Sequence, residues 1–294
     1  NGWCALTALG SGIERSELTV NVPADLEQYI FEAAAGGVSV RGLNGDILAT
    51  SGAGSIDMDE IRGNVTARTG GGAMTFGRVS GALRCLSGGG TIRAARAGGE
   101  AILESAGGES WLDEAGGPVR ASPAGNIHIG QAGGPVSAHT AGGLIEVGRA
   151  GGAVTAETAS GNIIIGPAPG VHAEAANGAI RMHGVSGVIR AATASGAIVL
   201  ALGADQPLGN SFLPSGRGDI PVVAPPKLSM TVKALNESGS YYSRFVSEFP
   251  EVRAQQPASP GVRRAVLAEG AINGGGPVLI ISAGNGSVYL KRAR

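Results

Sequence analysis

Apolar positions recur with a fixed spacing along most of the chain. A glycine returns at regular intervals from Gly37 to Gly196, and fifteen of the eighteen intervals are nine residues long while three are eight. In most units the second and fourth residues after the glycine are apolar, as Ile127 and Ile129 are in "GNIHIG". A spacing of two places both side chains on one face of a β-strand. The pattern therefore predicts an internal array with one short strand in every nine residues.

Alternate units of the array differ in the size of the fourth residue, so the true period is eighteen. One class carries a bulky residue there and the other carries a small one, in the series Met58, Phe76, Leu112, Ile129, Val147, Ile165, Met182, Leu200 and the series Ala49, Ala67, Cys85, Ala121, Ala138, Ala156, Ala173, Ala191. Two short strands per coil would stack bulky residues in one row and leave room for them with facing alanines. The sequence predicts an all-β fold, a two-sided β-solenoid of about nine coils of eighteen residues.

The corners between strands carry a second pattern. The seventh position of a unit is usually a small residue, most often alanine, and the glycines beside it are expected to permit positive φ where the chain turns. In the alanine class the sixth position is often hydroxylic, and a ladder of such side chains could bond the backbone of stacked corners. The ladder consists of Ser51, Thr69, Ser87, Ser105, Thr140, Thr158 and Thr193.

The repeat divides the chain into three parts. Residues 1–36 read as leading strands that cap the solenoid or pair with a neighbouring molecule, and residues 37–203 form the solenoid itself. Residues 204–294 are richer in proline and contain longer alternating strands. Because the end of a solenoid exposes unpaired backbone and apolar core, we expect this last part to form an antiparallel β cap.

Composition and charge exclude several classes of function. The chain has 52 glycines and 4% aromatic residues, so its core must be built from small side chains. Its net charge is −1 without a block of like charges, which argues against a nucleic-acid partner. No apolar run is long enough for a membrane span. The two cysteines, Cys4 and Cys85, lack the spacing of a metal site or a disulfide framework, and we expect small apolar side chains.

The quoted units carry a family resemblance. "NGDILATSGAGSID" and "SGNIIIG", preceded by "LTVNVPADLEQYIFEAAAGGVSVRG" and followed by "GGGPVLIISAGNGSVYLKR", resemble the bacterial adhesin-like β-solenoid family over about residues 18–292. That family comprises secreted or surface proteins without assigned chemistry. The resemblance implies a non-catalytic extracellular or envelope protein with no family catalytic residues to transfer. A chain that begins at Asn1 is compatible with a removed secretion signal.

Candidate chemistry is sparse. A calcium-binding nonapeptide roll needs an aspartate at one fixed place in each turn, and the aspartates do not share a position. The four histidines, His128, His139, His172 and His183, occupy different strand positions and are not expected to converge on one ion. A polysaccharide hydrolase would need a pair of acidic residues on neighbouring coils. The third position of the units, which is the first to point outward, shows no such pair. We therefore expect no catalytic, cofactor or metal site, and no enzyme.

Exposed apolar residues are the remaining functional signal. Trp111, Ile164 and Val199 occupy outward positions and form a candidate contact surface, unless the C-terminal strands fold over it. The motif Arg217–Gly218–Asp219 resembles an integrin ligand, but we interpret a match of only three residues in a glycine-rich chain as chance. Two functions fit this sequence. One is a structural protein of the cell exterior that adheres, or that associates with copies of itself in a fibre or surface layer. The other is a monomeric module that binds a glycan or envelope component.

Overall fold

The described residues form strands and no helix. A computed structural model describes residues 3–8 (backbone only), 20–204, 207–236, 244–255 and 266–293. They fall into two compact units, Asn1–Gly134 (unit 1) and Pro135–Arg294 (unit 2), and each unit contains two sheets, A and B. Within these residues no helix could cross a membrane.

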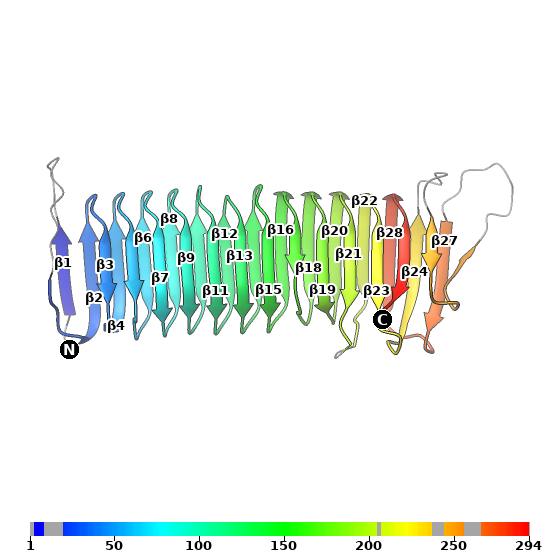
Figure 1. Ribbon diagram of the computed structural model, residues 1–294, viewed down its shortest axis with the longest axis horizontal. Coiled ribbons are helices and arrows are strands. Elements are labelled where there is room, and N and C mark those ends of the chain that lie inside the picture. The colour runs from blue at the N-terminus through cyan, green and yellow to red at the C-terminus, as the bar shows by residue number, and fades with distance from the viewer. Residues whose placement is uncertain (1–2, 9–19, 205–206, 237–243, 256–265, 294) are drawn as a thin grey trace. The chain divides into compact units, whose positions relative to one another are not determined.

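Unit 1 is a two-sided β-solenoid (Figure 1). Its sheet A has the order β1 (Trp3–Ala8), β2 (Asp25–Ala33), β4 (Asn44–Ser51), β6 (Val65–Thr69), β8 (Leu83–Ser87), β10 (Ala101–Ser105), β12 (Val119–Pro123). Its sheet B has the order β3 (Val38–Arg41), β5 (Ile56–Asp59), β7 (Met74–Val79), β9 (Ile92–Ala97), β11 (Ser110–Ala115), β13 (Ile127–Ala132). The strands of each sheet are parallel, and β1 joins sheet A with Trp3 beside Gln28 and Ala8 beside Ala33.

Unit 2 repeats this arrangement. Its sheet A has the order β14 (Val136–Thr140), β16 (Val154–Ser160), β18 (Val171–Asn177), β20 (Ile189–Ser195), β22 (Ser211–Arg217), β28 (Val278–Asn285), β24 (Met230–Asn236), β27 (Val266–Ile272), β26 (Arg253–Gln255). Its sheet B has the order β15 (Ile145–Ala150), β17 (Ile163–Ile165), β19 (Ile180–Val185), β21 (Ile198–Leu202), β23 (Ile220–Ala224), β29 (Val288–Arg292), β25 (Phe245–Ser247).

The expected antiparallel cap is confirmed only for two strands. β27 pairs antiparallel with β24, and β26 pairs antiparallel with β27. The other strands after residue 204 extend the two parallel sheets, because they keep the alternation of buried and outward residues that the repeats have. The leading strand β2 and these trailing strands also raise the number of turns above the nine expected.

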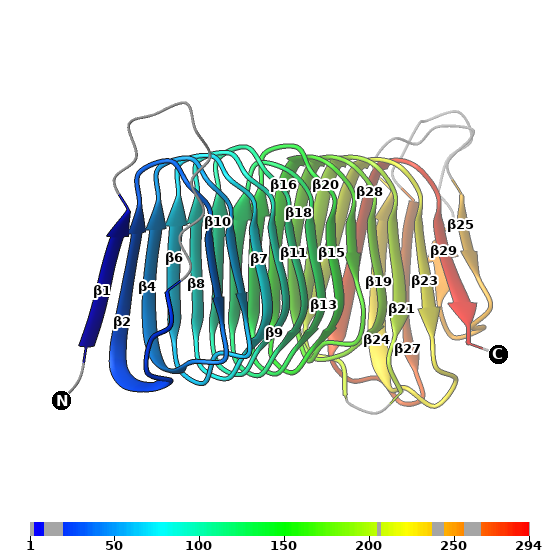
Figure 2. The same cartoon turned by 60° about the vertical axis from the view of Figure 1, so that its left-hand side comes forward.

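The coil formed by β28 and β29, which are the last described strands along the sequence, lies inside unit 2 and not at its end. β28 pairs with β22 on one side and with β24 on the other. In the same way β29 lies between β23 and β25 in sheet B, as Figure 2 shows. The coil formed by β28 and β29 therefore separates two coils that precede it in the sequence.

The interior of each unit contains the predicted rows of apolar side chains. Ile127 in unit 1 is buried, and in unit 2 the buried Ile145 and Ile163 are register partners on β15 and β17. One coil reverses the sizes, since Ala94 occupies the bulky row and Leu103 the small row, and both are buried. The exchange keeps one large and one small residue in that coil, which preserves close packing.

Close approach of the backbone, more than turn conformation, explains the corner glycines. An ideal Cβ on Gly72 would lie 2.0 Å from the carbonyl oxygen of Gly54, one coil earlier, and a Cβ on Gly90 would lie 1.9 Å from that of Gly72. Neither glycine has a positive φ. The prediction of positive φ is correct at Gly178 and Gly196 but wrong for most corners. Stacking at about 4.8 Å leaves no space for a side chain there.

The hydroxyl ladder of the corners is confirmed. Ser105 Oγ accepts a hydrogen bond from the Gly108 N–H and donates one to the Gly90 carbonyl, both at 2.9 Å. Ser51 makes the equivalent bonds to Gly54 and Gly36. These side chains join successive coils by satisfying buried backbone groups, so their role is structural.

Candidate interaction surfaces

Trp111 lies on β11 of unit 1, and one face of its ring is covered. The residue is 44% exposed, and its indole N–H donates a hydrogen bond to Asp113 Oδ1 at 3.1 Å. The ring stacks on His128, its register partner on β13, with centroids 4.0 Å apart and an interplanar angle of 23°. A sugar ring could therefore stack only on the face of the indole that is turned away from His128.

Ile164 and Val199 lie on sheet B of unit 2 and are not adjacent. Ile164 is the register partner of Arg181 on β19, and Arg181 is in turn the partner of Val199 on β21. Both apolar side chains are half-buried. The C-terminal strands do not fold over them, because those strands stack beside β21 in the same sheet. Of the candidate contact surface, Val199 alone belongs to a continuous apolar row.

That row continues along the four final strands of sheet B. We call it the B row: Val199, Pro221, Tyr289 and Val246, which lie side by side on β21, β23, β29 and β25. Val246 is 47% exposed and the other three are half-buried. The sequence pattern does not indicate three of these four residues as a surface row, because β29 lies between strands that are far from it in the sequence.

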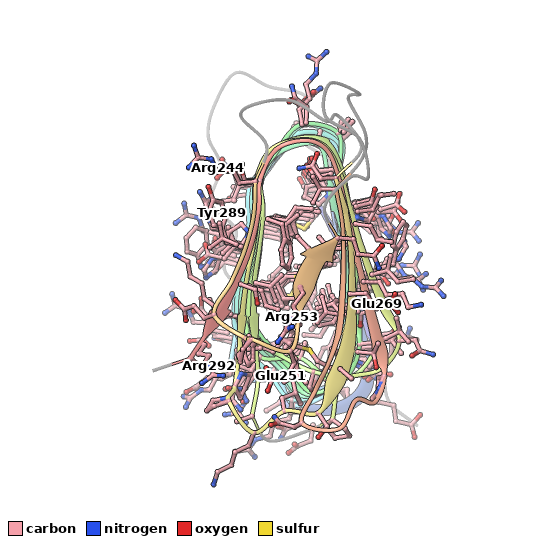
Figure 3. The ribbon with its side chains drawn as sticks, turned by 90° about the vertical axis from the view of Figure 1, so that its right-hand side faces the viewer. Arg244, Glu251, Arg253, Glu269, Tyr289 and Arg292 are labelled. Atoms are coloured by element: carbon pink, nitrogen blue, oxygen red, sulfur yellow. The ribbon has the colours of Figure 1, made fainter. Side chains whose placement is uncertain are left out.

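Sheet A of unit 2 carries a second apolar surface on the same coils. Phe212 and Ile280 are register partners on β22 and β28, and they are 44% and 41% exposed. Leu235 and Leu267 are partners on β24 and β27. We call these four residues, with Pro214, the A patch. Tyr289 of sheet B and Glu269 of sheet A point to opposite sides of the unit in Figure 3, so the B row and the A patch occupy opposite faces.

A polar network lies on sheet A at the other end of unit 2. Ser137 Oγ is 2.9 Å from His139 Nε2, and His139 Nδ1 is 3.2 Å from Glu157 Oε2. On β18, His172 Nε2 is 3.2 Å from Glu174 Oε1, and Glu174 is the register partner of Glu157. This acidic pair lies on neighbouring coils, but at the second outward position. Comparing the second outward residue of every second unit, as well as the first, would have found it.

The order of atoms from Ser137 to Glu157 is that of a nucleophile, a base and an orienting acid. Acyl transfer also needs oxyanion donors and a site that excludes water. Backbone N–H groups of β16 and β18 are used in the sheet ladder, and the described hollows lie at corners, not over this network. Among the described residues no three His, Cys, Asp or Glu side chains gather as a metal site.

The far end of unit 2 is closed by the segment after β25. Phe249 and Val252 are buried, and the Arg292 guanidinium lies 4.9 Å from the centre of the Phe249 ring. Figure 3 shows Glu251 and Arg253 across this end, between the two sheets. Charged groups over the core oppose addition of further strands. Glu251 and Arg253 therefore disfavour the stacking of another solenoid on this end.

Two smaller sequence features have structural roles. The Asp219 carboxylate of the Arg217–Asp219 motif accepts a hydrogen bond from the Ser287 N–H at 2.7 Å, which ties the corner to the neighbouring coil. Cys85 is a free, buried thiol, and its burial raises the thiol pKa well above the ordinary value. A thiol in this environment is unreactive. Cys4 lies on β1, outside the residues whose side chains are described.

No protein-family model, curated protein or solved structure matches this chain.

Proposed function

We propose that this chain is a non-enzymatic structural protein of the cell exterior that associates with copies of itself through the outer faces of unit 2. The observation that carries the proposal is the B row, four apolar side chains side by side on an outward face. Exposed apolar surface of this kind marks contact sites. The extracellular location rests on the family resemblance of the sequence.

Three features support contact through the faces and not through other parts of the chain. The charged groups Glu251 and Arg253 lie over the end of unit 2, which disfavours end-to-end stacking. The stacking of Trp111 on His128 covers one of the two ring faces that a glycan could use. The net charge of −1 produces no long-range repulsion between copies.

The size of the face predicts weak and concentration-dependent association. Sheet B of unit 2 has seven strands, and strands of about five residues spaced by about 4.8 Å give a face of roughly 550 Å². Two such faces in contact bury roughly 1,100 Å², just below the roughly 1,200–2,000 Å² of stable interfaces. We therefore expect monomers at low micromolar concentration and assemblies at submillimolar concentration.

Sedimentation velocity over a concentration series tests the proposal. We expect the weight-average sedimentation coefficient to rise with concentration for the natural chain and to stay at the monomer value for the double variant Val199→Glu/Val246→Glu. The matched control is Thr75→Glu, an outward and exposed position on sheet B of unit 1. Thermal unfolding checks that all three proteins are folded.

Two results would contradict the proposal. A natural chain that stays monomeric up to submillimolar concentration would favour the other function, the monomeric glycan-binding module, and saturable binding on a glycan array would then support that module. Association of the Val199→Glu/Val246→Glu variant at the same concentration as the natural chain would exclude the B row as the contact.

A further inference from the structure

We infer that copies stack by translation, with sheet A of one unit 2 on sheet B of the next, so that the assembly grows as an open ribbon. This inference rests on the proposed self-association and specifies its partner surface. The B row and the A patch lie on opposite faces of the same coils. A molecule with two different contact faces can bind one copy on each side.

Strand direction fixes which residues would meet. The strands of sheet A and sheet B run in opposite directions, as the arrows in Figure 1 show, because each coil ascends one sheet and descends the other. We number the outward-facing residues of each strand in sequence order. If one copy is shifted sideways onto the next, the second outward residue of a sheet A strand opposes the first outward residue of the sheet B strand of the same coil. Packed sheets keep such an alignment within about 30°.

Two pairs of apolar residues would meet in this alignment, while Ile280 on β28 would oppose the aliphatic stem and charge of Lys291 on β29. Pro214 holds the second outward position of β22 and would oppose Pro221 on β23. Leu235 holds the corresponding position of β24 and would oppose Val246 on β25. Where Phe212 would oppose Val223, sheet A projects further, since Phe212 is 44% exposed and Val223 is half-buried. Where Leu235 would oppose Val246, sheet B projects further, since Val246 is 47% exposed and Leu235 is half-buried.

The charged residues match as well. Glu174 holds the second outward position of β18 and would oppose Arg181, which holds the first outward position of β19 in the same coil. A pair of sheet A faces related by a twofold axis parallel to the strands at this coil would instead place Glu174 against Glu174. A pair of sheet B faces related in this way would place Arg181 against Arg181. Like charges at these positions disfavour both of these symmetric pairings.

Contacts between unlike faces do not close when copies are related by translation, and they generate open assemblies. The inference therefore predicts continued growth with concentration and no stable dimer for the natural chain.

Mixing two blocked variants tests the stacking order. Phe212→Glu/Ile280→Glu blocks the A patch, and Val199→Glu/Val246→Glu blocks the B row, at outward positions in both cases. Each variant alone is expected to be monomeric by sedimentation velocity. An equimolar mixture is expected to form a one-to-one heterodimer that does not grow further. The control is the pair Thr66→Glu/Thr75→Glu on unit 1, which should associate as the natural chain does.

The outcomes separate the stacking order from self-association itself. A monomeric natural chain overturns the proposed function. A second outcome is that the natural chain associates, one blocked variant still dimerises alone, and mixing the two variants produces no further association. This outcome overturns only the stacking of sheet A on sheet B and indicates symmetric pairing of the unblocked face.

Charge exchange tests the register. Glu174→Arg and Arg181→Glu are each expected to raise the concentration at half-association by about two- to fivefold, the range of an exposed ion pair. The variant that carries both changes should return to the natural value, because the opposed charges are again unlike. A double variant weaker than either single variant overturns the proposed register.

Discussion

Removing the hydroxyl group of Ser105 is expected to destabilise unit 1 by about 2–6 kcal/mol. The side chain is 4% exposed and bonds the N–H of Gly108 and the carbonyl of Gly90, both of which are buried. Ser105→Ala leaves these two backbone groups without a partner, and each unsatisfied buried group costs about 1–3 kcal/mol. The change creates no large cavity, so the loss reports on the hydrogen bonds themselves.

Two measurements on the full chain check this value. Urea unfolding should show a lower midpoint for Ser105→Ala, and amide hydrogen exchange should show faster exchange of the Gly108 N–H. Ser105→Thr is the matched control, because threonine holds the same ladder position at Thr69 and makes both bonds there. The variant Ser122→Ala removes an exposed hydroxyl from the next strand. If Ser105→Ala unfolds within about 0.5 kcal/mol of the natural chain, the ladder does not stabilise the corners as argued.

Three further predictions concern unit 1. Gly72→Ala should lower the stability by about 3 kcal/mol, since its Cβ would lie 2.0 Å from the Gly54 oxygen. Gly71→Ala, whose Cβ would have no atom within 4 Å, should be neutral or stabilising by up to about 1 kcal/mol. Equal urea midpoints for the two variants would refute the close-approach explanation. Ser110→Ala should raise stability by about 1 kcal/mol, because the buried Ser110 Oγ has no partner among the described residues, and a lower melting temperature would contradict this. The N–H of Arg78 lowers the pKa of Asp59, so the carboxylate stabilises the fold above about pH 4 and loses this effect as the pH falls through the lowered pKa. The stability difference between the natural chain and Asp59→Asn should shrink below about pH 4, and a difference that is independent of pH would refute the assignment.

The repeat itself could be predicted from sequence because its signal is local. Alternating apolar residues give strands, the glycine period gives the coil length, and the alternation of Ala138 with Val147 gives the two sides of the core. Each step depends on residues within eighteen positions of one another. The hydroxyl ladder follows from the same spacing, since Ser105 and Gly90 are fifteen residues apart.

The order of the last strands could not be predicted in this way. β24 and β28 have the same alternation of buried and outward residues, so the pattern does not distinguish which of them pairs with β22. The apolar surfaces depend on that order: Phe212 meets Ile280, and Pro221 meets Tyr289, only because the coil of β28 and β29 lies between the others. Trp111 was correctly placed at an exposed outward position, but the stacking on His128 depends on rotamers that a sequence pattern does not contain.

The internal position of β28 and β29 makes the end of unit 2 dependent on a complete polypeptide. In a solenoid wound in simple sequence order, a chain that stops early lacks only its outermost turn, and every turn already present keeps its neighbours. Here a nascent chain that stops before residue 278 would lack an inner turn, and β24 and β25 would have neither of the strands they pair with in parallel. Folding at this end must therefore wait until β28 and β29 have been synthesised, and termination before them would expose strand edges that these two strands otherwise cover.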